Sequence, residues 1–296
     1  MHGPLSRPLP APDYAYSQGM ARRVLITGAT SGIGLEAARA LAAQGMAVVI
    51  VGRDPVKTQR VAAELSRGQP EAVEYLLADL QRMASVRRLA AEYRERYGEL
   101  DVLINNAGSF FSSRTVTEDS LEATFALNHL APFLLTHLLL DLITAAPAGR
   151  VVTVSSAAHV GARMHWDDLQ LAKRYSGFTA YGQSKLANLL FSRELARRLA
   201  GTKATSNALH PGAVATSLFD RGTNGALKLA LRLIRPFMLD PVQGARTTVY
   251  LASSPQVADV SGLYFVKEKP AAPSRQAQDD AAAARLWSAS EELLSQ

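Results

Sequence analysis

Residues 22–52 read RRVLITGATSGIGLEAARALAAQGMAVVIVG, and this stretch decides the fold class. Two apolar, β-branched runs, 22–28 and 46–52, flank a segment with the apolar spacing of a helix. Gly45 follows that segment at the position where a glycine ends a helix. The stretch therefore predicts a strand, a helix and a second strand parallel to the first, with a glycine-rich turn between the first strand and the helix.

The same alternation continues along the chain. Asp54 precedes Pro55, which predicts a helix N-cap followed by a proline at the first helical position. The remaining predicted elements are helices at 55–68, 82–98, 121–144, 177–199 and 241–252, strands at 72–79, 100–108, 149–156, 204–211 and 262–266, and a last helix beginning near Asp279. Strands joined by helices form parallel sheets that are covered on both faces. We therefore predict an α/β chain with one doubly wound Rossmann fold and a mostly parallel, seven-stranded sheet.

Residues 22–296 are predicted to form a single domain. The first 20 residues carry four prolines and no apolar run of a secretory signal, so we expect a flexible leader at 1–21. Two insertions interrupt the alternation, at 157–180 and 218–240. The second has an apolar and a basic side, which favours a substrate lid, with a lipid-contacting surface helix as the alternative.

Composition excludes several classes of site. The chain of 296 residues has no cysteine, which rules out disulfides, thiolate metal sites and a cysteine nucleophile. Its six histidines show no metal-ligand spacing, so no metal is expected. The net charge is +6, but the lysines and arginines are spread along helical segments, and no nucleic-acid partner is predicted.

The most apolar stretch, 127–146, contains two histidines, a proline and an aspartate. Those residues favour a buried or interface helix over a membrane span. We therefore expect a cytoplasmic protein with no transmembrane segment.

The turn TGATSGIG at 27–34 lies where a strand ends and a helix begins. Backbone N–H groups and a helix N-terminus at such a place bind phosphate, although a plain strand-to-helix turn is the alternative. The predicted cofactor-binding residues here are Gly28, Thr30, Ser31, Gly32, Ile33 and Gly34.

The end of the second strand predicts the cofactor. An NAD site has a carboxylate about 20 residues after the glycine loop, whereas Gly52 has no side chain and Arg53 offers a cation for a 2′-phosphate. NADP(H) is therefore favoured over NAD(H). Asp54 is the alternative carboxylate, but its place before Pro55 favours a helix cap. Replacing Gly52 with Asp and Arg53 with a neutral residue should move the preference towards NADH.

Tyr181 and Lys185 are four residues apart and share one face of a predicted helix. A tyrosine with a pKa of about 10 exchanges protons poorly at neutral pH. A nearby ammonium can lower that pKa by about 1 to 3 units, so we expect Tyr181 to act as an acid/base.

Together, TGxxxGIG at 27–34, NNAG at 105–108, Asn128, the serine pair at 155–156 and YxxxK at 181–185 resemble the short-chain dehydrogenase/reductase family, over residues 22–266. The resemblance implies a catalytic tetrad of Asn128, Ser156, Tyr181 and Lys185. Ser156 would bind the substrate oxygen and Tyr181 would protonate it. Lys185 would also bind the nicotinamide ribose, and Asn128 would position a water that relays protons.

The resemblance also implies the other cofactor contacts. Asp79 and Leu80 would lie near the adenine, and Thr216 would bind the nicotinamide carboxamide. The full implied set adds Asn106, Ala107, Gly108, Pro211, Gly212 and Val214.

The long insertion 157–180, LHPG at 209–212 and ARLWSASEELL at 284–294 look like the retinol dehydrogenase and WW-domain oxidoreductase branch. This implies hydride transfer between NADP(H) and a lipophilic carbonyl or alcohol, with a homodimer as an open possibility. The main alternative is a non-catalytic nucleotide-binding or sensing protein. A second is an epimerase or dehydratase, whose glycine spacing and larger C-terminal domain differ from this chain.

Overall fold

The computed structural model describes residues 21–214 and 239–295. Most of the leader predicted at 1–21, Thr216, and the lid predicted at 218–240 except for its last two residues lie outside the described residues.

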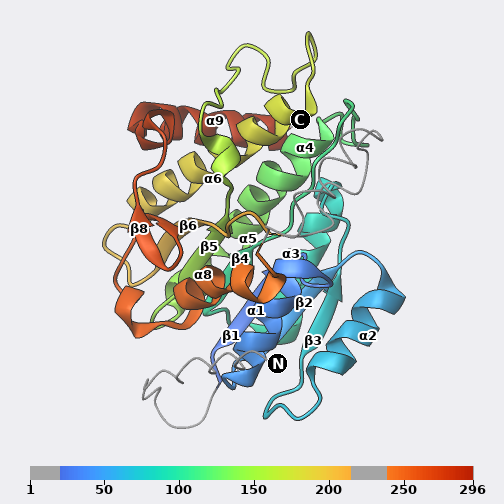
Figure 1. Ribbon diagram of the computed structural model, residues 1–296. Coiled ribbons are helices and arrows are strands. Elements are labelled where there is room, and N and C mark those ends of the chain that lie inside the picture. Colours follow the sequence, from blue (N-terminus) through green and yellow to red (C-terminus); the bar gives the residue numbers. More distant parts are fainter. Residues whose placement is uncertain (1–20, 215–238, 296) are drawn as a thin grey trace, which may run out of the picture.

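Within these ranges, eight strands form one sheet in the order β3-β2-β1-β4-β5-β6-β7-β8 (Figure 1). The strands are β1 (Arg23–Thr27), β2 (Ala47–Gly52), β3 (Glu74–Leu77), β4 (Val102–Asn105), β5 (Arg150–Val154), β6 (Thr205–His210), β7 (Tyr264–Val266) and β8 (Lys269–Ala271). Neighbouring strands run parallel except for β7 and β8. The predicted doubly wound, mostly parallel fold is confirmed.

The eighth strand corrects the predicted count of seven. β8 pairs antiparallel with β7 across a two-residue turn of Lys267 and Glu268, both at positive φ (51° and 64°). Such turns normally carry Gly, Asn or Asp, so this sequence gives no hairpin signal. The strand itself, KPA, is exposed and has a proline, as edge strands often do.

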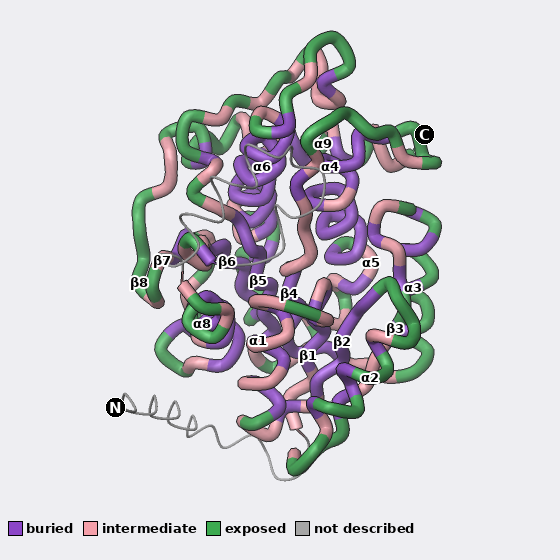
Figure 2. The backbone as a smooth tube through the Cα atoms, turned by 45° about the vertical axis from the view of Figure 1, so that its right-hand side comes forward, coloured by how far each residue is buried: buried purple, intermediate pink, exposed green. Residues whose placement is uncertain are grey.

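Helices cover both faces of the sheet. On one face lie α1 (Gly32–Ala43), α2 (Pro55–Leu65) and α8 (Pro241–Ser253); on the other lie α3 (Met83–Tyr97), α5 (Ala131–Ala145) and α6 (Gly177–Arg198), with α9 (Asp280–Ser295) packed on α6. Side chains of β1 alternate between the two cores: Val24 and Ile26 pack with α1, whereas Leu25 packs with the α3 and α5 side. Figure 2 shows the central strands and α6 buried, with exposed residues on the outer sides of α2 and α3.

Helix ends follow the sequence prediction where short polar residues cap them. The Asp54 carboxylate accepts a hydrogen bond from Lys57 N at 2.8 Å and caps α2, directly before Pro55. Gly45 adopts φ of +79° just beyond α1. Both residues therefore have the structural roles predicted for them.

The helix predicted at 121–144 consists of α4 (Ala123–Phe125), a π-helical turn η1 (Ala126–Leu130) and α5. Ala131 N donates to Ala126 O, and Pro132 has no N–H for Asn128 O. Asn128 O therefore lacks the donor that residue 132 would supply in a regular α-helix. Among the described residues, Ala123–Ala145 is the one helix long and apolar enough to cross a membrane, but 67% of its apolar window is buried, as in a core helix.

Candidate active site

A cavity of about 860 Å³ opens at the carboxyl ends of the parallel strands. It is lined by residues that follow each of β1 to β6, because parallel strands bring all their carboxyl ends to one edge. Every predicted cofactor-binding residue in the described ranges lines it, as do Ser156, Tyr181 and Lys185. Asn128 does not line it.

The glycine loop is held against the turn after β4. Gly28 has φ of +68°, and a Cβ there would lie 2.8 Å from Ala107 Cα. Asn106 Nδ2 donates to Thr27 O at 2.9 Å and to Gly28 O at 3.2 Å. The close approach of these two turns therefore requires a glycine at 28, and it leaves the loop backbone facing the cavity.

The cavity wall after β2 carries two cations. Arg53 is exposed and Lys57 is half-buried, and both line the cavity. The Asp54 carboxylate is engaged at the α2 N-terminus, as described above. Sequence reasoning missed Lys57, although its place three residues after the helix cap puts it in the first turn beside the glycine loop.

Asp79 and Leu80 follow β3, and Pro211, Gly212 and Val214 follow β6. Asp79 Oδ1 accepts from Gln81 N at 3.1 Å, which holds the carboxylate at the turn. Gly212 adopts φ of +93°, so only glycine takes this conformation without strain. Both segments thus present polar backbone at the cavity.

Tyr181, in the second turn of α6, hydrogen-bonds with the Ser156 hydroxyl, and only 7% of its surface is exposed. Ser155, beside it, is buried, and its hydroxyl donates to Lys185 O at 2.7 Å. The two serines therefore differ: Ser155 attaches β5 to α6, and Ser156 contacts the tyrosine hydroxyl.

Lys185 Nζ lies 5.6 Å from the centre of the Tyr181 ring and donates to Val154 O at 3.1 Å. A Cβ on Gly108 would lie 3.3 Å from the same nitrogen, so the ammonium sits against the turn after β4. Burial lowers the pKa of Lys185 to about 8. An ammonium has three donors, and within the described part of the chain Lys185 donates to Val154 O alone, so donors remain for a ligand.

The Tyr181 pKa corrects the sequence expectation. Burial raises the pKa of Tyr181 to about 12, and the hydrogen bond with Ser156 offsets only part of that rise. The expectation of a lowered Tyr181 pKa is therefore wrong, because the loss of water around the buried phenol dominates.

Asn128 is fully buried in the π turn beneath the site. Its Oδ1 accepts from Ser109 N at 2.8 Å, while its Nδ2 donates to Ser109 O and Ser184 Oγ, each at 3.0 Å. The side chain thus joins the loop after β4 to α6, the helix that carries Tyr181. The polar atoms of its side chain are therefore used in this bracing.

Two histidines hold the Ser156 turn. His159 Nδ1 lies 2.6 Å from Ser156 O, and its Nε2 accepts from Ser274 N at 3.2 Å. His210 Nδ1 accepts from Ala157 N at 3.3 Å, and this histidine lines the cavity. These bonds use the neutral rings, and burial lowers the pKa of both. The sequence placed His210 at a strand end but gave no sign of this contact.

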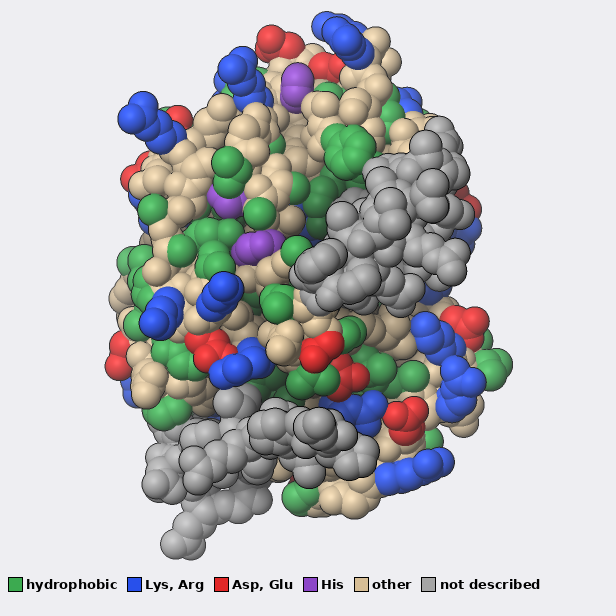
Figure 3. Space-filling view, in the orientation of Figure 1, with side chains coloured by type: hydrophobic (Ala, Val, Ile, Leu, Met, Phe, Trp, Pro, Cys, Tyr) green, Lys and Arg blue, Asp and Glu red, His purple; other side chains and the backbone are tan. Residues whose placement is uncertain are grey.

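We also looked at charged and metal-ligating side chains outside the cavity. Figure 3 shows Lys and Arg side chains dispersed among acidic ones over one face, without a single basic patch. In residues 21–214 and 239–295, no group of three His, Asp or Glu side chains could hold a metal ion.

Comparison with known proteins agrees with the geometry. Residues 22–225 match the short chain dehydrogenase family. Retinol dehydrogenase 12 of Mus musculus is 42% identical over 92% of this chain and 85% of its own. "Putative daunorubicin C-13 ketoreductase DnrU" of Streptomyces sp. (strain C5) is 40% identical over 95% of this chain and 96% of its own. Polyprenol dehydrogenase of Homo sapiens is 38% identical over 92% and 84%.

Solved structures show the same fold. A crystal structure of a protein from Mycobacterium Paratuberculosis matches with a TM-score of 0.74 at 38% identity, covering 93% of each chain. A short chain dehydrogenase from Pseudomonas syringae matches with a TM-score of 0.65 at 26% identity, over 82% of this chain and 93% of its own.

Proposed function

This chain belongs to the short chain dehydrogenase family, and we propose that it transfers a hydride between NADP(H) and a lipophilic carbonyl/alcohol pair, with Tyr181 as the acid/base. The observation that carries the proposal is the cluster at the cavity: Tyr181 bonded to Ser156, with the Lys185 ammonium beside them. A protein that only bound nucleotide would not need these three groups at one point.

The cavity fits a nicotinamide dinucleotide. Its glycine loop leaves no room for a Cβ at Gly28, and Gly34 is as confined, since a Cβ there would overlap Asn106. Bound there, the nicotinamide would supply the hydride in reduction and accept it in oxidation. The loop would bind the pyrophosphate, Lys185 the ribose hydroxyls, and Arg53 with Lys57 the 2′-phosphate of NADP(H).

The remaining chemistry belongs to the side chains. In reduction, negative charge develops on the substrate oxygen, and the Ser156 and Tyr181 hydroxyls would donate hydrogen bonds to it. With a pKa of about 12, Tyr181 holds its proton at neutral pH and can give it to that oxygen. Below pH 8 Lys185 is an ammonium, which stabilises the resulting phenolate.

Oxidation requires the opposite protonation state. Tyr181 must then accept a proton, so its raised pKa makes oxidation slow at neutral pH and faster as pH rises. We assign the main-chain carbonyl of Asn128, whose regular helical donor is replaced by Pro132, to holding a water that returns protons from solvent.

A lipophilic substrate is supported by the apolar side chains near Tyr181. Phe111 and Leu127 line the cavity, and Phe110 packs edge-on to the Tyr181 ring with 6.1 Å between ring centres. Phe178 packs against Phe110 with 5.2 Å between ring centres and the rings tilted by 54°, and it is 62% exposed. Retinol and polyprenol, which appear in the names of two relatives, are largely apolar molecules, in keeping with this wall.

NADPH consumption tests the reaction. We would screen apolar ketones and aldehydes against small polar carbonyls of equal reactivity, and we expect turnover to favour the apolar set. The absence of carbonyl-dependent NADPH oxidation across the panel, with cofactor bound, would leave the non-catalytic alternative.

Titration tests the cofactor. A charge-assisted contact is worth about 1.5 to 3 kcal/mol, so NADPH should bind about tenfold to a hundredfold more tightly than NADH. Arg53→Ala should remove most of that difference and leave NADH affinity unchanged. Equal affinities in the parent would contradict the NADP(H) assignment while leaving the reaction intact.

Several expectations from the sequence stay predictions: a flexible leader at 1–21, a single domain at 22–296, a lid at 218–240, a homodimer and a cytoplasmic location. Light scattering tests the homodimer, and separation of membrane from soluble fractions tests the location.

A further inference from the structure

Gly52, the last residue of β2, lies buried at the cavity wall, where NAD sites carry a carboxylate. A Cβ built on Gly52 would overlap Thr58 Oγ1, and it would lie 2.6 Å from Thr30 Cγ2 and 3.0 Å from Thr58 Cγ2. Two threonines from different elements therefore fill the space into which a side chain at 52 would grow.

Thr58 has little freedom to move out of that space. It is fully buried in the first turns of α2, and its hydroxyl donates to Asp54 O at 2.5 Å. Its backbone N donates to the same carbonyl at 2.9 Å. A β-branched side chain in a helix has few rotamers available, so Thr58 cannot turn away without breaking this contact.

The backbone of Gly52 is equally constrained. Gly52 pairs with Leu77 of β3, and its carbonyl accepts from Ala78 N at 3.0 Å. Thr30 differs from Thr58, because it is half-buried at the open cavity and its methyl group can rotate into that space. Thr58 is therefore the side chain that a residue at 52 would have to displace.

We propose that Thr58 is a specificity-determining residue: it excludes the NAD-type carboxylate from position 52 by occupying its space. The proposal rests on the NADP(H) preference proposed above and explains why that preference has two parts. Arg53 attracts the 2′-phosphate of NADP(H). Thr58 keeps position 52 free of the carboxylate that would bind the ribose 2′-hydroxyl of NAD(H). Thr58 does not line the cavity, so it acts on the cofactor only through position 52.

This changes the redesign expected from the sequence. Gly52→Asp with Arg53→Ala should not produce tight NADH binding, because the carboxylate must displace Thr58 before it can reach a ribose. A third change, Thr58→Ala, removes both atoms in the way and should let the carboxylate take its place.

We would measure dissociation constants for NADH and NADPH in an Arg53→Ala background. Adding Gly52→Asp should not lower the dissociation constant for NADH below that of the Arg53→Ala variant. Adding Thr58→Ala as well should tighten NADH about tenfold and weaken NADPH, since a carboxylate bonds a ribose hydroxyl and repels a phosphate. Thr58→Ala alone should keep the NADH to NADPH ratio of the parent.

Thr58→Val is the matched control, because valine keeps the volume of threonine and lacks the hydroxyl. Gly52→Asp with Thr58→Val should behave like Gly52→Asp alone. If valine and alanine at 58 released NADH binding equally, or if Gly52→Asp alone released it, the proposal would be overturned.

Thermal unfolding keeps the test decisive where the aspartate variant folds poorly. Gly52→Ala adds only the Cβ, so it should lower the melting temperature, and Thr58→Ala but not Thr58→Val should recover it. An unaltered melting temperature in Gly52→Ala would refute the steric exclusion. The titration of the parent protein tests the NADP(H) assignment separately. Equal affinities for NADH and NADPH in the parent would refute that assignment, whereas the melting temperatures would still test the steric exclusion.

Discussion

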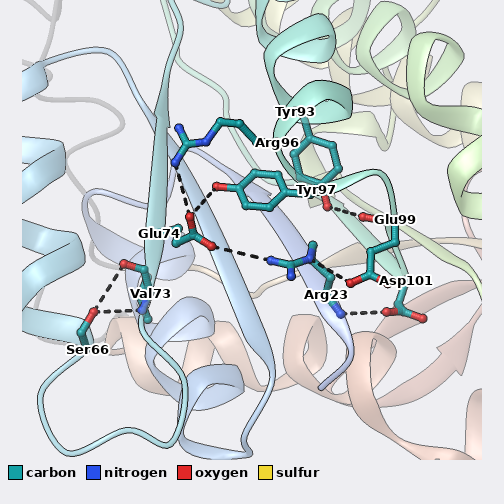
Figure 4. A network of polar contacts seen from close by, with 9 residues as sticks. All are labelled: Arg23, Ser66, Val73, Glu74, Tyr93, Arg96, Tyr97, Glu99 and Asp101. Atoms are coloured by element: carbon teal, nitrogen blue, oxygen red, sulfur yellow. Dashed lines mark hydrogen bonds and ion pairs between the residues drawn. The ribbon is translucent and has the colours of Figure 1, made fainter. Parts of the chain in front are cut away.

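Glu74 begins β3 and Asp79 follows it, so one short strand carries a carboxylate at each edge of the sheet. At the amino edge, Glu74 accepts hydrogen bonds from Tyr97 OH at 3.0 Å and Arg96 at 3.3 Å, and it pairs with Arg23 at 3.7 Å (Figure 4). At the carboxyl edge, Asp79 accepts from one backbone N–H and faces the cavity.

The same contrast holds across the whole sheet. Arg23, at the start of β1, also bonds Glu99 at 3.3 Å, and its backbone N donates to Asp101 at 2.7 Å. At the opposite edge, burial raises the pKa of Tyr181 and lowers the pKa of Lys185, so both side chains are held there at a cost. Polar groups at the amino edge therefore stabilise the fold, whereas those at the carboxyl edge are kept for a ligand at a cost in stability.

The largest expected effect comes from Tyr181→Phe. Without its proton donor the reaction should slow by about 10² to 10⁴ in turnover, while the dissociation constant for NADPH stays nearly unchanged. Stopped-flow reduction and a cofactor titration measure the two quantities.

Tyr97→Phe is the control from the amino edge. It removes a phenol hydroxyl that bonds Glu74, so it should lower stability by about 1 kcal/mol and leave turnover at the parent value. Parent-like turnover in Tyr181→Phe would remove the assigned chemistry.

Lys185→Met should move activity and stability in opposite directions. The pKa of Lys185 falls from 10.5 to about 8 on burial, which is a cost of about 3 kcal/mol when the lysine is charged. Methionine keeps an apolar stem without the charge, and Val154 O still accepts from Asn188 at 3.3 Å. At pH 7 the variant should be about 1 to 3 kcal/mol more stable than the parent but turn over far more slowly.

The pH dependence of that gain has a definite sign. Below pH 8 the lysine is charged in both the folded and the unfolded chain, so the full cost is present. Between about 8 and 10.5 the folded lysine gives up its proton before the unfolded one, so the parent gains stability as pH rises. Chemical denaturation at pH 7 and 10 should show the advantage of methionine shrinking; a variant less stable at pH 7 would mean that Lys185 supports the fold.

Most of the fold could be predicted from the sequence because each helix or strand can be recognised from its own residues. Apolar runs, the glycine turn and Asp54-Pro55 reflect backbone preferences that neighbours along the chain already settle. β8 could not be predicted from the sequence, because its turn consists of Lys267 and Glu268 without a glycine and its register depends on β7.

The site divides in the same way. The residue types of the tetrad are visible in the sequence because the chemistry needs them at set spacings. The Tyr181 pKa and the contact of Thr58 with position 52 were not visible, since burial and packing between α2 and β2 arise only when distant segments meet. A wrong sign for the Tyr181 pKa follows from counting the ammonium without the desolvation.

The smallest expected effects come from the two carboxylates of β3, and they compare the edges directly. Glu74→Gln removes a charge from a partly exposed network, its side chain being 40% exposed, so the loss should be about 1 kcal/mol, or about 2 °C in melting temperature, with NADPH affinity unchanged. Asp79→Asn keeps the oxygen that bonds Gln81 N, so stability should change by less than about 0.5 kcal/mol. Its effect should appear in NADPH affinity, weakened about threefold to tenfold as a charged acceptor becomes neutral. Calorimetry and cofactor titration on both variants give four numbers. The comparison fails if Asp79→Asn lowers the melting temperature as much as Glu74→Gln, because the carboxyl edge would then be stabilising the fold as the amino edge does.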